Sequence, residues 1–215
     1  MFPLKDIDRR PSRFPLVTTL IIALNTLVFL LELLKGIDFV ARWSYMPAEI
    51  AAGRGLIMLL TALFMHDGWL HIIGNMVFFW AFGPPVEDMM GRGKYLFFYL
   101  TCGVAASLAQ VLSNPASTLF NLGASGAIAG VIGAFLVAFP RDRIRTLVFV
   151  AVFRIPAIFL VGAWFVIQLF SEVGSFVVGR AGEVAYVPHV AGFVFGIVFA
   201  GLFKYQDRDK ETKKT

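Results

Sequence analysis

Residues 123–130 read GASGAIAG and open a long apolar run that continues to Phe139. Nearly all of these residues are small, and small residues allow membrane helices to approach one another closely. Such a stretch is usually a helix-packing element, yet this one also places a hydroxyl group, Ser125, inside the packed region. Two interpretations follow: Ser125 either packs between crossed helices or is held there as a nucleophile.

The composition predicts a membrane protein. The chain of 215 residues is 58% hydrophobic and 15% charged, with a mean hydropathy of +0.77. Soluble domains carry about 25% charged residues. Apolar runs near 20 residues recur without the alternation of a β-barrel, so we expect an all-α polytopic membrane protein. A single cysteine, Cys102, excludes a disulfide framework.

Six segments are long enough to be transmembrane helices, with Gly/Pro breaks such as Gly83-Pro84-Pro85 between them. The predicted helices are 16–34, 69–82, 95–112, 123–139, 155–170 (extending to 178 in a longer version) and 184–203. The apolar run 56–65 is too short to span, and it follows Trp43 and Tyr45, which favour the lipid headgroup level. We therefore expect a partly membrane-embedded first loop.

This pattern divides the chain into three parts. Residues 1–14 are expected to be a cytoplasmic tail, because they are basic and lack the short apolar region and cleavage site of a signal peptide. Residues 15–204 hold the six predicted helices, and residues 205–215 form a charged tail expected to be cytoplasmic, solvated and disordered.

Positive charge orients the predicted helices. Of the 19 Lys and Arg residues, only Lys35, Arg42, Arg54 and Arg180 fall on one side of the predicted membrane; the rest lie in the two tails and in loops 2–3 and 4–5. The positive-inside rule places both termini in the cytoplasm. The net charge of +5 is thereby explained by topology, and we expect no nucleic-acid partner.

Four polar side chains lie at similar depth in this scheme. His71 and Asn75 are at the start of the second helix, Ser125 at the start of the fourth and His189 at the start of the sixth. All three helices begin on the outer side of the membrane. Polar residues inside a membrane are expensive and usually paired or functional. Separate packing roles would not require this agreement in depth, so we infer one shared site.

The residue types of this site suit amide hydrolysis. Ser is a weak nucleophile until a neighbouring base such as His189 takes its proton, which requires contact at about 2.6–3.2 Å. His71, the Asn75 amide and the Ser125 backbone N–H can stabilise the resulting oxyanion. No carboxylate lies near His189 in sequence, which indicates a Ser–His dyad, although Glu172 and Glu183 of the outer loop stay open as a third member.

Glycines accompany both members of the predicted dyad. Gly126 and Gly130 form a stripe beside Ser125, and Gly192 and Gly196 follow His189 at i+3 and i+7. They would let the two helices approach closely enough for proton transfer.

The chain resembles the rhomboid intramembrane serine proteases of the six-helix bacterial type over about residues 45–200. The resemblance rests on H-x-x-x-N at 71–75, G-x-S-G at 123–126 and H-x-x-G-x-x-x-G at 189–196, in that order. It implies Ser125 as nucleophile, His189 as general base, and an oxyanion hole of His71, Asn75 and the backbone at Gly123 and Ser125.

The resemblance also implies how substrates are met. The position of the site suggests that single-pass transmembrane proteins are cut near the outer end of their span, and no cofactor or metal is expected. The compact chain without a soluble domain or targeting peptide suggests a bacterial inner membrane. The fifth helix and the loop after it would act as a gate for the substrate, with Trp164, Phe165 and Gln168 as candidate gate residues.

The chain departs from the family pattern at three places. Ile57 and Met58 stand where many members have Trp-Arg. Ala129 stands where some members have an aromatic residue that stacks on the catalytic His, so His189 would be held either less rigidly or from elsewhere. Pro188 replaces a small residue and is compatible with the first turn of a helix.

Three other functions agree less well with the sequence. An ion channel or transporter is disfavoured because only Glu32 is charged at mid-membrane and no inverted repeat is seen. A rhomboid-like protein that binds membrane proteins without cutting them would be expected to lack Ser125 or His189. A zinc protease is disfavoured because HExxH is absent.

Overall fold

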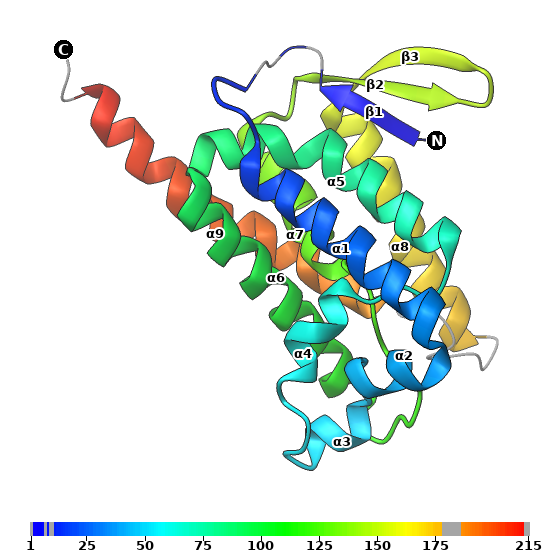
Figure 1. Ribbon diagram of the computed structural model, residues 1–215. Helices are drawn as coiled ribbons and strands as arrows, with labels where there is room; N and C mark the ends of the chain where they lie inside the picture. Colours follow the sequence, from blue (N-terminus) through cyan, green and yellow to red (C-terminus); the bar gives the residue numbers. More distant parts are fainter. Residues whose placement is uncertain (1, 7, 9–10, 178–185, 213–215) are drawn as a thin grey trace.

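The computed structural model describes residues 2–6, 8, 11–177 and 186–212, which form a mostly helical bundle with a small sheet at one end (Figure 1). Each of the six predicted segments contains a long helix. These helices are α1 (Leu16–Lys35), α5 (Trp69–Met90), α6 (Arg92–Ser113), α7 (Ser125–Ala138), α8 (Ala157–Val177) and α9 (Val187–Thr212). The first loop folds into the short helices α2 (Ile37–Trp43), α3 (Pro47–Ala51), α4 (Met58–Thr61) and η1 (Ala62–Phe64).

Length and hydropathy support membrane spans only in part. Among the described residues, α1 and α6 are long and apolar enough to cross a bilayer, whereas α7 and the apolar parts of α8 and α9 are shorter. With 14 residues, α7 is about 21 Å long, less than the roughly 30 Å of a hydrocarbon core. Every residue of α7 from Gly126 to Phe135 is buried, because other helices surround it. Six transmembrane helices therefore remain a prediction.

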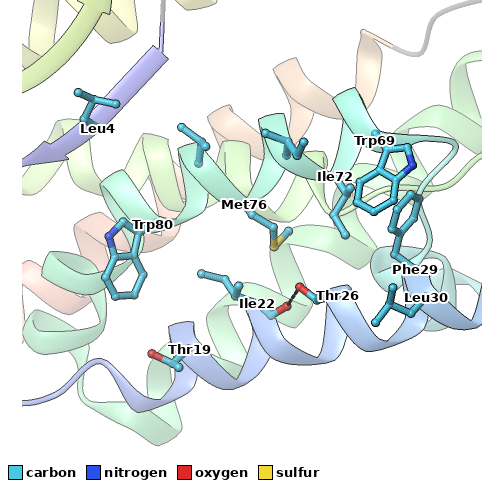
Figure 2. A pocket seen from close by; sticks show the side chains of 12 residues that line it. Leu4, Thr19, Ile22, Thr26, Phe29, Leu30, Trp69, Ile72, Met76 and Trp80 are labelled. Carbon is cyan, nitrogen blue, oxygen red and sulfur yellow. Dashed lines mark hydrogen bonds between the residues drawn. The ribbon is translucent and has the colours of Figure 1, made fainter. Parts of the chain in front are cut away.

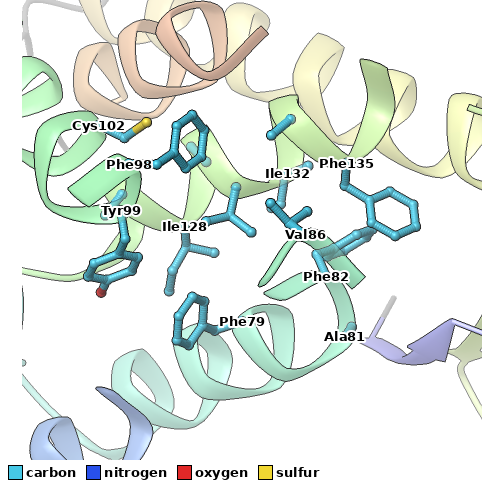
Figure 3. Packing of buried hydrophobic residues seen from close by; sticks show 14 of the residues in the cluster. Phe79, Ala81, Phe82, Val86, Phe98, Tyr99, Cys102, Ile128, Ile132 and Phe135 are labelled. Carbon is cyan, nitrogen blue, oxygen red and sulfur yellow. The ribbon is translucent and has the colours of Figure 1, made fainter. Parts of the chain in front are cut away.

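An aromatic core joins α5, α6 and α7. Phe82 of α5 meets Phe135 of α7 edge to face, with ring centroids 5.1 Å apart. Phe79 lies between Tyr95 and Tyr99 of α6, 6.4 and 5.1 Å from their ring centroids. Figure 3 shows the side chains of Phe79, Tyr99, Phe82 and Phe135 between the helices. The core fixes α5 and α6 against the central helix.

The contact between α7 and α9 is made by backbone. A Cβ atom built on Gly192 would collide with the carbonyl oxygen of Gly126, and one on Gly196 with the carbonyl oxygen of Gly130. A Cβ on Gly133 would likewise strike the Phe193 carbonyl oxygen. Gly192 and Gly196 therefore have to be glycine at this contact, whereas a Cβ on Gly126 or Gly130 would first collide with Ala106 or Cys102 of α6.

The predicted end of the second helix at residue 82 is wrong. Helix α5 continues through Pro84 and Pro85 to Met90, and all three residues of Gly83-Pro84-Pro85 are buried. Beyond them, the buried Glu87 carboxylate accepts hydrogen bonds from the backbone N–H groups of Val17 and Thr18 at 2.9 and 2.8 Å. It thereby satisfies donors that the first turn of α1 cannot use. This tertiary contact holds the last turns of α5 in place despite the prolines.

Both predicted tails also differ from expectation. Residues Phe2–Asp6 form β1, which pairs antiparallel with β2 (Arg143–Val148), and β2 pairs with β3 (Ala151–Pro156). The chain is therefore not purely α-helical: a three-stranded sheet covers the end of the bundle where α7 ends and α8 begins (Figure 1). At the other terminus, α9 is helical to Thr212 where disorder was expected.

The glycine contact predicts a large difference in stability between two conservative variants of α9. In Gly196→Ala the new methyl group meets the backbone of α7, which can relieve the overlap only by separating the helices. We expect the free energy of unfolding to fall by about 1–3 kcal/mol. In the control Gly201→Ala, nothing lies within 4 Å of the added methyl group. Thermal unfolding in detergent micelles, followed by far-ultraviolet circular dichroism, should show a lower midpoint for Gly196→Ala alone. Equal midpoints would contradict the contact.

Candidate active site

Two cavities differ in what they can do chemically. The larger, about 520 Å³, lies between α1 and α5 and is lined by apolar side chains including Trp69, Met76 and Trp80 (Figure 2). Its two hydroxyl groups bond back to carbonyl groups of their own chain segment: Thr19 to Pro15 at 2.8 Å and Thr26 to Ile22 at 2.9 Å. This cavity offers a lining for apolar groups and no titratable side chain.

The second cavity, about 250 Å³, brings together the polar residues singled out from the sequence. His71 and Asn75 reach it from α5, Ser125 from α7 and His189 from α9. Trp164 of α8 completes one wall. All four helices contribute, and three of them do so from their first turns. The remaining lining is apolar: Leu70, Gly74, Phe78, Ile128, Ala129 and Ile132.

Gly123 shapes the approach to Ser125. Its φ of 122° is in the region that favours glycine, and a Cβ there would lie 2.9 Å from His71 Cε1, 3.0 Å from His71 Nε2 and 3.7 Å from Ser125 Oγ. The imidazole of His71 therefore lies directly over this glycine and beside the serine. The Gly123 N–H donates to the Ala62 carbonyl oxygen at 2.8 Å. This bond engages the Gly123 N–H, and the place of Gly123 in the oxyanion hole stays a prediction.

Ser125 is the first residue of α7. Backbone N–H groups in the first turn of a helix have no partner within the helix. The first helical bond here runs from the Ile128 N–H to the Ala124 carbonyl at 3.0 Å. The Ser125 N–H thus precedes the helical hydrogen-bond ladder, at the positive end of the helix dipole, which favours negative charge.

His71 has an acidic partner that sequence reasoning missed. Its Nδ1 lies 2.7 Å from Oδ1 of Asp67, one helical turn earlier. When both ring nitrogens carry protons, Asp67 is the counter-ion and Nε2 becomes a donor on the side of Gly123. Asp67 precedes the first residue of α5, so its i, i+4 spacing from His71 did not by itself predict this contact.

Asn75 is oriented by a buried chain of contacts. Its Nδ2 lies 3.0 Å from His66 Nε2, and the His66 backbone N–H donates to both carboxylate oxygens of Glu32, at 3.1 and 3.3 Å. His66 lies in the loop before α5, and burial together with His71 lowers its pKa to about 4. A neutral His66 can accept from the Asn75 amide, which keeps a second N–H for other partners.

His189, the third residue of α9, is flanked by aromatic rings. The ring centroid of Trp164 lies 6.4 Å away, and that of Tyr186 lies 6.4 Å away nearly edge to face. Ala129 cannot stack on the imidazole, as the sequence indicated, and α8 supplies an aromatic side chain in its place. Of the two open carboxylate candidates, Glu183 and the side chain of Glu172 lie outside the described residues.

The gate candidates are on α8 and have different neighbours. Trp164 lines the cavity and contacts His189, whereas Phe165 stacks on Phe193 of α9 with ring centroids 4.6 Å apart. The side chain of Gln168 lies outside the described residues.

The first loop, where Trp-Arg is replaced by Ile57-Met58, has other braces. The Thr61 hydroxyl donates to the Trp43 carbonyl at 2.9 Å. Tyr45 and Asn121 exchange two backbone hydrogen bonds, at 3.1 and 2.8 Å. These contacts tie the loop to the segment that leads into Ser125.

Comparison with known proteins gives one consistent family. A family model described as Rhomboid domain matches residues 53–206. Rhomboid protein 1, mitochondrial, of Saccharomyces cerevisiae is 28% identical, over 83% of this chain and 51% of its own length. Rhomboid protease GluP of Bacillus subtilis is 35% identical, over 60% of this chain and 26% of its own. Rhomboid protease GlpG of Pectobacterium atrosepticum is 27% identical, over 86% of this chain and 61% of its own length. The chain thus spans between 26% and 61% of these relatives' lengths.

The His66–Asn75 contact predicts how stability depends on pH. The unfolded chain takes up a proton at His66 near pH 6.5, and the folded chain only near pH 4. The contribution of neutral His66 is therefore complete above pH 6.5 and is lost as the pH falls towards 4, by about 1.4 kcal/mol per pH unit. Unfolding midpoints at pH 7, 5.5 and 4.5 should fall more steeply for the wild type than for His66→Gln, whose amide oxygen accepts without titrating. An equal dependence of the unfolding midpoint on pH in the two proteins would contradict a neutral, buried His66.

Proposed function

The chain belongs to the rhomboid family, whose members are integral to membranes, and on this basis we propose that it is an intramembrane serine protease that cuts transmembrane segments with Ser125 and His189. The observation that carries the proposal is the convergence of Ser125, His189, His71 and Asn75 on one cavity. Four residues from three helices, chosen from the sequence for their chemistry, line the same small space. The names of several relatives, which describe rhomboid proteases, support the same class of reaction.

The proposed reaction begins with proton transfer from Ser125 Oγ to His189. The serine oxygen attacks the carbonyl carbon of the scissile peptide bond, and the carbonyl oxygen becomes an oxyanion. His189 then gives its proton to the leaving amine, which departs and leaves an acyl group on Ser125. A water molecule, deprotonated by His189, attacks this acyl group, and return of the proton to Ser125 restores the enzyme.

The oxyanion would be stabilised by donors that are fixed before the substrate arrives. Asn75 offers the second N–H of its amide, held in orientation by His66. His71 would offer Nε2–H in its doubly protonated form, with Asp67 as counter-ion at Nδ1. Ser125 offers its backbone N–H at the start of α7. Preorganised donors of this kind are commonly the largest single contribution to acyl-transfer catalysis.

We propose single-pass transmembrane proteins as substrates. The cavity lies near the ends of α5, α7 and α9 that positive charge assigns to the outer face, so cleavage would fall near the outer end of the substrate helix. Phe78, Ile128 and Ile132 give it an apolar wall. Entry past α8 would require Phe165 to leave Phe193, which is the contact we assign to the gate. We place the protein in a bacterial inner membrane with both termini in the cytoplasm.

The proposal is tested by covalent labelling of the purified protein with a serine-reactive fluorophosphonate. Labelling should occur in the wild type and fall below detection in Ser125→Ala and in His189→Ala, because the first lacks the nucleophile and the second its base. Ser113→Ala, the last residue of α6, whose hydroxyl donates to the Gln110 carbonyl at 2.9 Å and which does not line the cavity, is the matched control and should label like the wild type. A folded wild type that is not labelled and cuts no model transmembrane substrate would favour a binding role without catalysis.

Removal of one oxyanion donor should slow the chemical step. For Asn75→Ala we expect kcat on a model transmembrane substrate to fall by about 10²–10³, with little change in KM, because the lost hydrogen bond forms in the transition state. Cleavage assays in proteoliposomes over a range of substrate mole fractions separate the two constants. A change confined to KM would assign Asn75 to substrate binding and contradict its role as a donor.

A further inference from the structure

The hairpin formed by β2 and β3 has two chemically different faces. Along β2, Ile144 and Thr146 are fully buried against the rest of the molecule, and the alternating residues Arg143 and Arg145 are exposed. Ile144 belongs to the same core cluster as Phe135 and Phe139. Because side chains alternate along a strand, one face of the hairpin is turned towards the helical bundle and the other away from it. In a membrane-integral protein, the first face is the one turned towards the bilayer.

The apolar face continues beyond the bundle. Phe153, the cross-strand partner of Thr146, is 51% exposed, and the two turn residues Phe149 and Val150 are 95% and 97% exposed. Figure 1 shows the hairpin lying across the end of the bundle, with its turn beyond the ends of the helices. These side chains therefore overhang the space beside the bundle, which lipid fills around a membrane protein.

The two residues of the turn are unfavourable in water. Val148 and Ala151 are paired, so Phe149 and Val150 form a two-residue turn, and Phe149 has a φ of 53°. Two-residue hairpin turns with positive φ strongly prefer Asn-Gly or Asp-Gly. A bulky residue at positive φ is strained and exposes its ring fully in this position. An apolar solvent around the turn gives both side chains a favourable environment that water would not.

The opposite face carries a basic row. Arg145 on β2 is directly opposite Arg154 on β3, and Lys5 of β1 is the register partner of Arg145 on the other side. Like charges placed opposite one another destabilise a sheet. Asp8 pairs with Arg143 at 2.8 Å and lies within electrostatic reach of Arg154, but among the described residues neither Arg145 nor Arg154 makes a salt bridge. Bound anions would reduce the repulsion among these basic side chains.

We propose that the β2–β3 hairpin is an interfacial membrane anchor, with Phe149, Val150 and Phe153 inserted below the headgroups of the cytoplasmic leaflet and Arg145 and Arg154 bound to anionic phospholipid headgroups. Apolar insertion combined with basic residues at headgroup level is the physical pattern of interfacial anchors. The anchor would also fix the start of α8, which is hydrogen-bonded to the residues just before β2. The Ala157 N–H donates to the Asp142 carbonyl oxygen at 2.8 Å, and the Ile158 N–H donates to the Pro140 carbonyl oxygen at 3.1 Å.

Depth-dependent quenching tests the insertion. The full-length variant Val150→Cys carries a nitrobenzoxadiazole label, since the native Cys102 is buried. It is placed, one copy per disc, in nanodiscs of phosphatidylcholine and phosphatidylglycerol. We expect several-fold stronger quenching by lipid spin-labelled at acyl carbon 5 than by aqueous iodide. The matched control Arg145→Cys, on the other face of the same hairpin, should show the reverse order.

A second measurement tests the headgroup contact. In the labelled Val150→Cys protein, quenching by spin-labelled phosphatidylglycerol should exceed that by spin-labelled phosphatidylcholine at equal mole fraction. Each bound arginine is expected to enrich the anionic lipid roughly fivefold. Arg145→Gln/Arg154→Gln should abolish this preference, because the variant keeps the apolar turn and loses the charges. A preference that survives the double substitution would overturn the headgroup assignment.

Two results would overturn the anchor itself. Iodide access at residue 150 equal to that at residue 145 would show the turn to be in water. Protection from iodide that appears only with two or more copies per disc would assign the face to contact between chains. Neither readout depends on catalysis, so loss of activity in Ser125→Ala leaves the test unchanged and the proposed function is judged separately.

Discussion

The backbone contact between α7 and α9 is the constraint on which the rest of the structure depends. Gly192 and Gly196 lie against the carbonyl oxygens of Gly126 and Gly130, at a separation that excludes any side chain. Membrane helices gain little from hydrophobic burial against lipid, so close packing has to supply the association. Because Ser125 and His189 stand at the starts of these two helices, the same contact that joins the helices also sets the distance between the proposed nucleophile and base.

A short α7 is a consequence of this arrangement. A helix of 14 residues cannot cross a bilayer alone, and it has no need to when its neighbours enclose it. Ser125, the first residue of this helix, lines the cavity together with side chains of α5, α8 and α9. The polar groups of the site line a cavity between four helices, and hydrogen bonds in such partly buried surroundings are stronger than in water.

The site also depends on the first loop, which contributes no residue to the cavity wall. The Ala62 carbonyl oxygen accepts a hydrogen bond from the Gly123 N–H. The His66 ring contacts the Asn75 amide, and the His66 backbone N–H donates to the carboxylate of Glu32 in α1. Glu32, the one charge expected at mid-membrane, is thereby explained by a structural contact and not by an ion path. Trp164 of α8 flanks His189 from the other side. Support for the four central residues thus comes from three separate parts of the chain.

The sequence by itself determined the six long helices, because continuous apolar runs and glycine spacing are local signals. It also grouped His71, Asn75, Ser125 and His189, since residues at equivalent helix starts share a depth in the membrane. It failed where a distant contact overrides the local rule. Helix α5 passes Pro84 and Pro85 because Glu87 is bound by α1, and residues 2–6 pair with a strand more than 130 residues away. The partners Asp67, His66 and Trp164, and the engagement of the Gly123 N–H, were decided only by the tertiary structure. Hydrogen bonds and ring contacts depend on the relative placement of helices, and no spacing within one segment encodes it.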